Sequence, residues 1–165
     1  MKHIFVLFGL SIVTVGCNQS NSNEAYFENQ IKELEKKIEN AYTPGFGDFM
    51  GSIQNHHNKL WFAGINENWE LAAFEIHELE EIFEDIENTY PNREETKFIP
   101  MIHPGLEAVE KAVSEQNSDI FKSSYQTLTN ACNTCHKATK HEFINITIPT
   151  APSYTNQDYK PFSND

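Results

Sequence analysis

Five consecutive residues near the C-terminal end of the chain have types and spacing that could do chemistry: Cys132-Asn133-Thr134-Cys135-His136. Two thiols three positions apart, with a His directly after them, form the C-x-x-C-H pattern of c-type haem attachment. Each thiol adds across a vinyl group of the porphyrin, and the imidazole supplies an axial ligand to the iron. We therefore predict one covalent haem c, attached through Cys132 and Cys135, with His136 as the proximal iron ligand.

Two other uses of a Cys pair match the sequence less well. A structural zinc site needs four ligands, whereas the chain has no second Cys pair and offers only His141 as a third ligand. A thioredoxin-like redox pair is expected in a βαβ setting, but this pair lies late in a helical pattern. Both alternatives stay open at this point.

The N-terminus has the features of an export signal. A charged start precedes an apolar stretch over residues 4–16, which is too short to span a hydrocarbon core of about 30 Å and is typical of a signal peptide. The stretch ends in a tetrapeptide that resembles the lipobox of bacterial lipoproteins: Thr14-Val15-Gly16-Cys17. This resemblance implies acylation of Cys17 and a location on the periplasmic or cell-surface face of a bacterial membrane. The alternative is an ordinary signal peptide with a free Cys.

Hydrophobic periodicity predicts an all-α fold. Apolar residues recur at steps of three and four over residues 24–42, 48–63, 68–90, 104–116 and 119–139. We expect Asp48 to cap the second of these helices and Gly64 to end it. Because the linkers between the last four helices are short, neighbouring helices should run antiparallel, as in a four-helix bundle with an extra N-terminal helix.

The predicted segmentation has four parts. Residues 1–16 form the signal peptide, and residues 17–45 form a lipid-anchored spacer and stalk helix. Residues 46–141 form the haem-binding bundle, and residues 142–165 form an extended tail that we expect to run over the bundle or the haem edge.

A bundle of four helices with one haem motif near the end of the last helix resembles the class II cytochromes c, the cytochrome c′ group. The resemblance covers about residues 48–139, and its sequence-specific element is the haem motif. It implies a monohaem cytochrome that is an electron carrier or haem-binding protein rather than an enzyme, although a small peroxidase or nitrogen-oxide enzyme stays open as a third possibility. The first possibility is one-electron transfer by a six-coordinate haem, and the alternative is binding of NO or CO by a five-coordinate iron.

The second axial position of the iron separates these two functions. In an up-down-up-down bundle the start of the first helix lies beside the end of the fourth, which brings Met50, His56 and His57 to the height of the motif. Low-spin class II cytochromes use a Met early in the first helix, and Met50 matches that position. His57, on the same stripe as Met50, is the alternative distal ligand, and an iron with no second protein ligand also stays open.

The charge of the chain bears on its partners. A formal net charge of −12 at pH 7 argues against nucleic acid and against docking on anionic lipid by charge. Nine acidic residues fall between Glu67 and Glu87, where Glu78, Glu81 and Glu84 could steer a basic redox partner protein or form a solvated helix face. We also expect contact with a membrane through the lipid anchor, and a dimer stays open.

Overall fold

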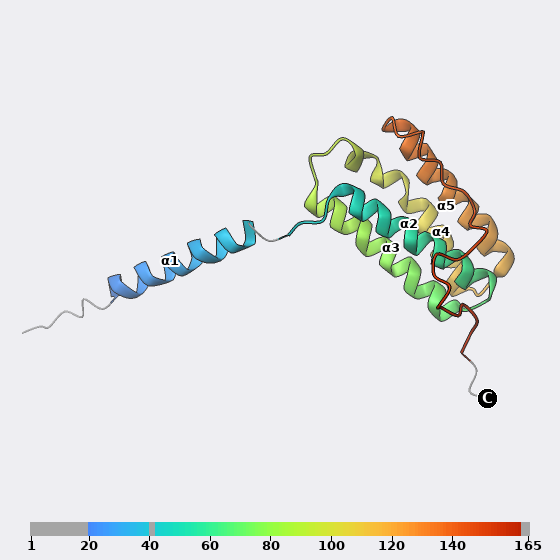
Figure 1. Cartoon of the computed structure of the whole chain (residues 1–165), viewed down its shortest axis with the longest axis horizontal. Helices are drawn as coiled ribbons and strands as arrows, with labels where there is room; N and C mark the ends of the chain where they lie inside the picture. Colours follow the sequence, from blue (N-terminus) through green and yellow to red (C-terminus); the bar gives the residue numbers. More distant parts are fainter. Residues whose placement is uncertain (1–19, 40–41, 163–165) are drawn as a thin grey trace, which may run out of the picture. The chain divides into compact units, whose positions relative to one another are not determined.

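The computed structural model describes residues 20–39 and 42–162, and these residues form an all-α structure (Figure 1). No strand occurs within these two ranges, and none of their helices is long and apolar enough to cross a membrane. The prediction of an all-α fold is therefore confirmed. The helices, in chain order, are α1 (Ser20–Glu39), α2 (Phe46–Ile65), α3 (Trp69–Thr89), the 3-10 helix η1 (Glu95–Met101), α4 (His103–Ser114) and α5 (Ser118–Ala138).

The chain divides into two compact units, with α1 in the first and residues 44–162 in the second. Helix α1 carries the expected apolar stripe, and its side chains, including Phe27, Ile31 and Leu34, are more than half exposed. Cys17 and the signal-peptide segment lie outside the described residues.

Helices α2 to α5 lie side by side in the second unit, and successive helices run in opposite directions (Figure 1). The apolar stripes predicted from the sequence meet in one core, where Leu60, Leu79, Ile86 and Leu106 are almost completely buried. Full burial of one such side chain contributes about 1.5–3 kcal/mol. The core therefore fixes the register of the helices, and with it the height at which α2 faces the end of α5.

The boundaries of α2 differ from the prediction at both ends. The helix begins two residues earlier, with Gly45 as N-cap, and the Gly45 N–H donates to Asp48 Oδ2 at 2.8 Å. Gly64 does not end the helix: it is buried inside α2, where an added Cβ would overlap the ring of Phe121. Because Gly64 has no side chain, α5 can pack closely against α2 at this position. The sequence pattern alone did not show this contact.

Three helices end in the same kind of turn, in which a non-glycine residue adopts a left-handed conformation. These residues are Glu67 (φ 59°), Gln116 (φ 51°) and Lys140 (φ 61°), directly after the C-caps of α2, α4 and α5. In each turn the next residue donates its N–H to a carbonyl five positions back, which is the Schellman arrangement. The turns reverse the chain sharply and bring each following segment back along the helices.

The tail after α5 has no helix or strand within residues 142–162, and it runs back along the helices (Figure 1). Three asparagine side chains bind its backbone: Asn133 of α5, Asn58 of α2 and Asn68 at the start of α3. Near its end the Tyr159 ring is buried. The tail is thus a fixed part of the second unit.

Candidate functional site

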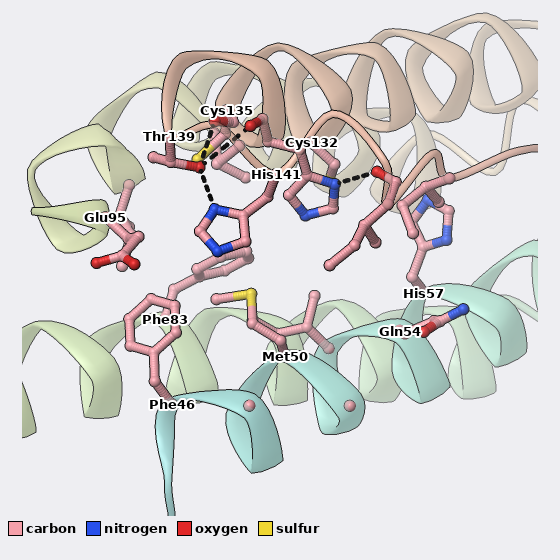
Figure 2. Close-up of a pocket in the computed structure, with 18 of the residues that line it drawn as sticks. Phe46, Met50, Gln54, His57, Phe83, Glu95, Cys132, Cys135, Thr139 and His141 are labelled. Carbon is pink, nitrogen blue, oxygen red and sulfur yellow. Dashed lines mark hydrogen bonds between the residues drawn. The ribbon is translucent and has the colours of Figure 1, made fainter.

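A cavity of about 440 Å³ opens where the start of α2 faces the end of α5 (Figure 2). Its volume lies within the range of about 300–1,000 Å³ that is usual for sites of small molecules and cofactors. Most of its walls are apolar, from α2, α3, the η1 region and the tail: Phe46, Met50, Ile53, Phe83, Ile99, Ile102, Ile144 and Ile146. The haem motif provides Cys132, Cys135 and His136 on the α5 side.

The ring of His136 is oriented by a hydrogen bond to the tail. Its Nδ1 lies 2.7 Å from the carbonyl oxygen of Ile144. Because a carbonyl oxygen can only accept, Nδ1 is the donor, and in this tautomer of the imidazole the lone pair is on Nε2. This is the arrangement of a metal-binding imidazole, whose second nitrogen donates to a backbone carbonyl.

The two thiols of the motif lie one helical turn apart on α5, and both line the cavity (Figure 2). Neither forms a disulfide. Burial and the neighbouring Cys135 raise the pKa of Cys132 to about 12, and burial and Glu95 raise the pKa of Cys135 as well. Without a bound cofactor, both sulfurs are therefore thiols at neutral pH.

Met50 extends from α2 into the space below α5 (Figure 2). Gly47 and Gly51 flank it one turn apart, both line the cavity, and a Cβ on either would meet no atom within 4 Å. At both positions the helix backbone therefore borders open space without a side chain to cover it. Each Gly lowers the stability of the helix by about 1 kcal/mol relative to Ala. A flat ring covalently held by α5 fits beside such a surface, and the residues present fit a haem.

His57 also lines the cavity, but both of its ring nitrogens have protein partners. His57 Nε2 lies 3.0 Å from the Thr129 hydroxyl oxygen, which itself lies 2.9 Å from the Tyr125 carbonyl oxygen. The Tyr125 hydroxyl lies 2.9 Å from His57 Nδ1 and 2.7 Å from the His57 carbonyl oxygen. Burial lowers the pKa of His57 to about 4, so the ring is neutral. To bind a metal ion, His57 would have to break one of these hydrogen bonds.

The other histidines take different positions. His56 does not line the cavity and has its Nδ1 2.7 Å from the buried Glu75 carboxylate, and His77 is exposed beside Glu81. His103 begins α4, 3.9 Å from a carboxylate oxygen of Glu87, and does not line the cavity.

His141, which the sequence offered only as a zinc ligand, does line the cavity, with its Nδ1 at 3.3 Å from Thr139 Oγ1. Across residues 20–39 and 42–162, no three His, Cys, Asp or Glu side chains form a group that could hold a metal ion.

Sequence reasoning missed the polar rim of the cavity. Arg93, the only arginine in the sequence, lies 4.5 Å from the ring centre of Phe46 and donates from Nε to Glu95 Oε2 at 2.9 Å. A backbone hydrogen bond and Arg93 hold the pKa of Glu95 below its usual range. A single arginine in an acidic chain is a signal that could have been noticed. Both carboxylate oxygens of Glu95 are paired with Arg93, so the rim carries an ion pair.

Comparisons with known proteins give no match: no family model fits the chain, and neither the curated proteins nor the solved structures include a significant relative. The function must therefore be inferred from the haem motif and the geometry of the cavity.

Proposed function

We propose that this protein is a monohaem c-type cytochrome that carries single electrons outside the cytoplasm. The observation that supports this most directly is the convergence of three groups on one apolar cavity: the two thiols Cys132 and Cys135, and His136 with Nε2 free. When bound there, a haem supplies the one-electron chemistry of its iron. A thioredoxin-like redox pair is expected in a βαβ unit, and the described residues contain no strand, so this alternative has less support.

The chain's own residues would hold the cofactor and set its environment. Cys132 and Cys135 would anchor the porphyrin edge, and His136 would face the iron from α5. Met50 would be the second protein ligand of the iron, because its side chain lines the cavity while both ring nitrogens of His57 are hydrogen bonded elsewhere. A Met ligand and apolar walls both favour the reduced iron and so raise the reduction potential.

The fold that we propose for the second unit is a four-helix bundle. The antiparallel order of α2 to α5, with the motif in the last turns of α5, supports a four-helix bundle of the cytochrome c′ type. Helix α1 would then be the stalk between this bundle and the membrane.

We further propose that the protein is exported and held at a membrane by a lipid anchor. Acylated Cys17 would tether the protein to the outer face of a bacterial membrane. Exposed carboxylates on α3, including Glu81 and Glu84, would steer a basic redox partner. Mass spectrometry of the purified protein tests the anchor, and an unmodified Cys17 with cleavage elsewhere would remove it.

One set of absorption spectra tests electron transfer against gas binding. The full chain is expressed in a bacterial host that matures c-type cytochromes, and the oxidised and reduced forms are recorded with and without carbon monoxide. We expect a low-spin reduced haem that does not bind carbon monoxide. Met50→Ala should convert it to a high-spin form that binds the gas, whereas the matched change His57→Gln should leave it low-spin. A high-spin wild-type protein that binds carbon monoxide would support the gas-binding function instead.

A further inference from the structure

The end of α5 turns the chain back across His136. Lys140 adopts the left-handed conformation, and the His141 N–H donates to the His136 carbonyl at 2.7 Å. A second turn follows at once, in which the Ile144 N–H donates to the His141 carbonyl at 2.8 Å. The tail therefore passes beside the imidazole of His136 within eight residues of it.

Asn133, the first variable residue of the haem motif, binds this returning segment with both ends of its side-chain amide. Its Nδ2 donates to the Ile146 carbonyl at 2.8 Å, and its Oδ1 accepts from the Ile146 N–H at 2.8 Å. The amide thus pairs with a tail residue as a neighbouring strand would. Two residues earlier, the Ile144 carbonyl accepts the His136 Nδ1–H.

Little else fixes the tail at this point. Phe143 is 79% exposed and Ile144 is 42% exposed, so apolar burial contributes little there. The next anchor is Asn58, which binds the backbone of Ala151 and Ser153. Between the end of α5 and that anchor, the tail is attached by the hydrogen bonds of Asn133 and His136 and, further along, by Ile148, which is partly buried against the core.

We infer that Asn133 is a positioning residue: with the tail residues 144–146 it forms a clamp that holds the imidazole of His136 with Nε2 toward the cavity. The inference rests on the proposed role of His136 as an iron ligand. The clamped carbonyl fixes the tautomer of His136, and as an acceptor it also makes Nε2 a stronger donor to a metal. Asn133, at a variable position of the haem motif, would then hold the iron ligand His136 in its orientation.

Limited proteolysis tests the clamp in the full chain. Chymotrypsin can cut after the exposed Phe143, and cleavage requires the tail to leave α5. Loss of the two Asn133 hydrogen bonds in Asn133→Ala should speed this cut by about tenfold. Asn133→Asp, which keeps the acceptor for the Ile146 N–H, should give an intermediate rate. Thr134→Ala is the matched control, because Thr134 is exposed and donates only to the Asn130 carbonyl within α5.

The reduction potential of the haem-loaded protein separates positioning from a merely structural role. A weaker hydrogen bond from His136 Nδ1 makes Nε2 a poorer donor to ferric iron, so the potential of Asn133→Ala should rise relative to wild type and Thr134→Ala. Equal cleavage rates in all variants would overturn the clamp, and faster cleavage with an unchanged potential would overturn the positioning role. A colourless wild-type protein would instead refute the proposed function, while the cleavage comparison would still test the clamp.

Discussion

Lowering the pH from 7 to 5 should destabilise this protein through His57. The side chain is only 4% exposed, and its two ring nitrogens are hydrogen bonded to Thr129 and Tyr125. A proton added to the ring would convert an acceptor into a donor and place a charge in the core. Burial accordingly lowers the pKa of His57 from 6.5 to about 4.

The size of the effect follows from this pKa difference. Between pH 4 and 6.5 the unfolded chain binds a proton at His57 that the folded chain does not, so the free energy of unfolding falls as the pH falls. With the two pKa values of 6.5 and about 4, the loss is about 2 kcal/mol between pH 7 and pH 5, and about 3 kcal/mol by pH 4. Burial raises the pKa of Glu75 and of Glu80, and these groups act in the opposite direction.

Urea unfolding at several pH values, followed by circular dichroism, measures this free energy. Comparison of wild type with His57→Gln cancels the contribution of the carboxylates. From pH 7 to pH 5, the free energy of unfolding of wild type should therefore fall by about 2 kcal/mol relative to that of His57→Gln. His77→Gln is the control, because it is the same substitution at an exposed histidine on α3, outside the core. A difference between wild type and His57→Gln that stays constant over this range would refute the reasoning.

Three further substitutions test the packing of the second unit by urea unfolding. In the haem-free protein, Gly51→Ala should raise the free energy of unfolding by about 0.5–1 kcal/mol, because the new Cβ meets no atom within 4 Å and Ala favours the helix; a loss of stability would show that this face is not open. Gly64→Ala should lower it by about 1–3 kcal/mol, because the new Cβ would overlap the Phe121 ring, and an unchanged value would contradict the close approach of α2 and α5. Tyr159→Phe should raise it by about 1 kcal/mol, because the buried hydroxyl has no hydrogen-bond partner in the described part of the chain; a decrease would indicate a partner.

The sequence was sufficient for the helices whose apolar residues recur regularly. The stripe that includes Ile76, Leu79, Phe83 and Ile86 predicted α3, and all four side chains are buried. Asn68, where the helix was expected to begin, is its N-cap, and its side chain accepts from the Leu71 N–H at 3.2 Å. Local signals of this kind depend on a few neighbouring residues, which is why they can be read without the fold.

Other features depend on contacts between distant residues. The segment Glu95–Met101 has no apolar period, and the sequence did not indicate a 3-10 helix there. Gly64 looked like the end of a helix, because nothing in the sequence places Phe121 against it. The role that we infer for Asn133 requires the tail to return along α5, which depends on the turn at Lys140.

The candidate site also combines residues that the local sequence indicated with contacts between distant residues that it did not indicate. The motif indicated Cys132, Cys135 and His136 by type and spacing alone, and antiparallel order brought Met50 into the same cavity. The hydrogen bonds that occupy both nitrogens of His57 could not be foreseen, because Thr129 and Tyr125 are about seventy residues away in the chain.

Intact mass measured under denaturing conditions tests the central claim most directly. The full chain is matured in a host that attaches c-type haem, and the protein is unfolded in acid so that any noncovalent haem dissociates. We predict a coloured protein whose mass exceeds that of the polypeptide by one haem, and we predict that this increase is lost when both Cys132 and Cys135 are replaced by Ala. A colourless protein from the same host, with both thiols free or bound to zinc, would contradict the claim.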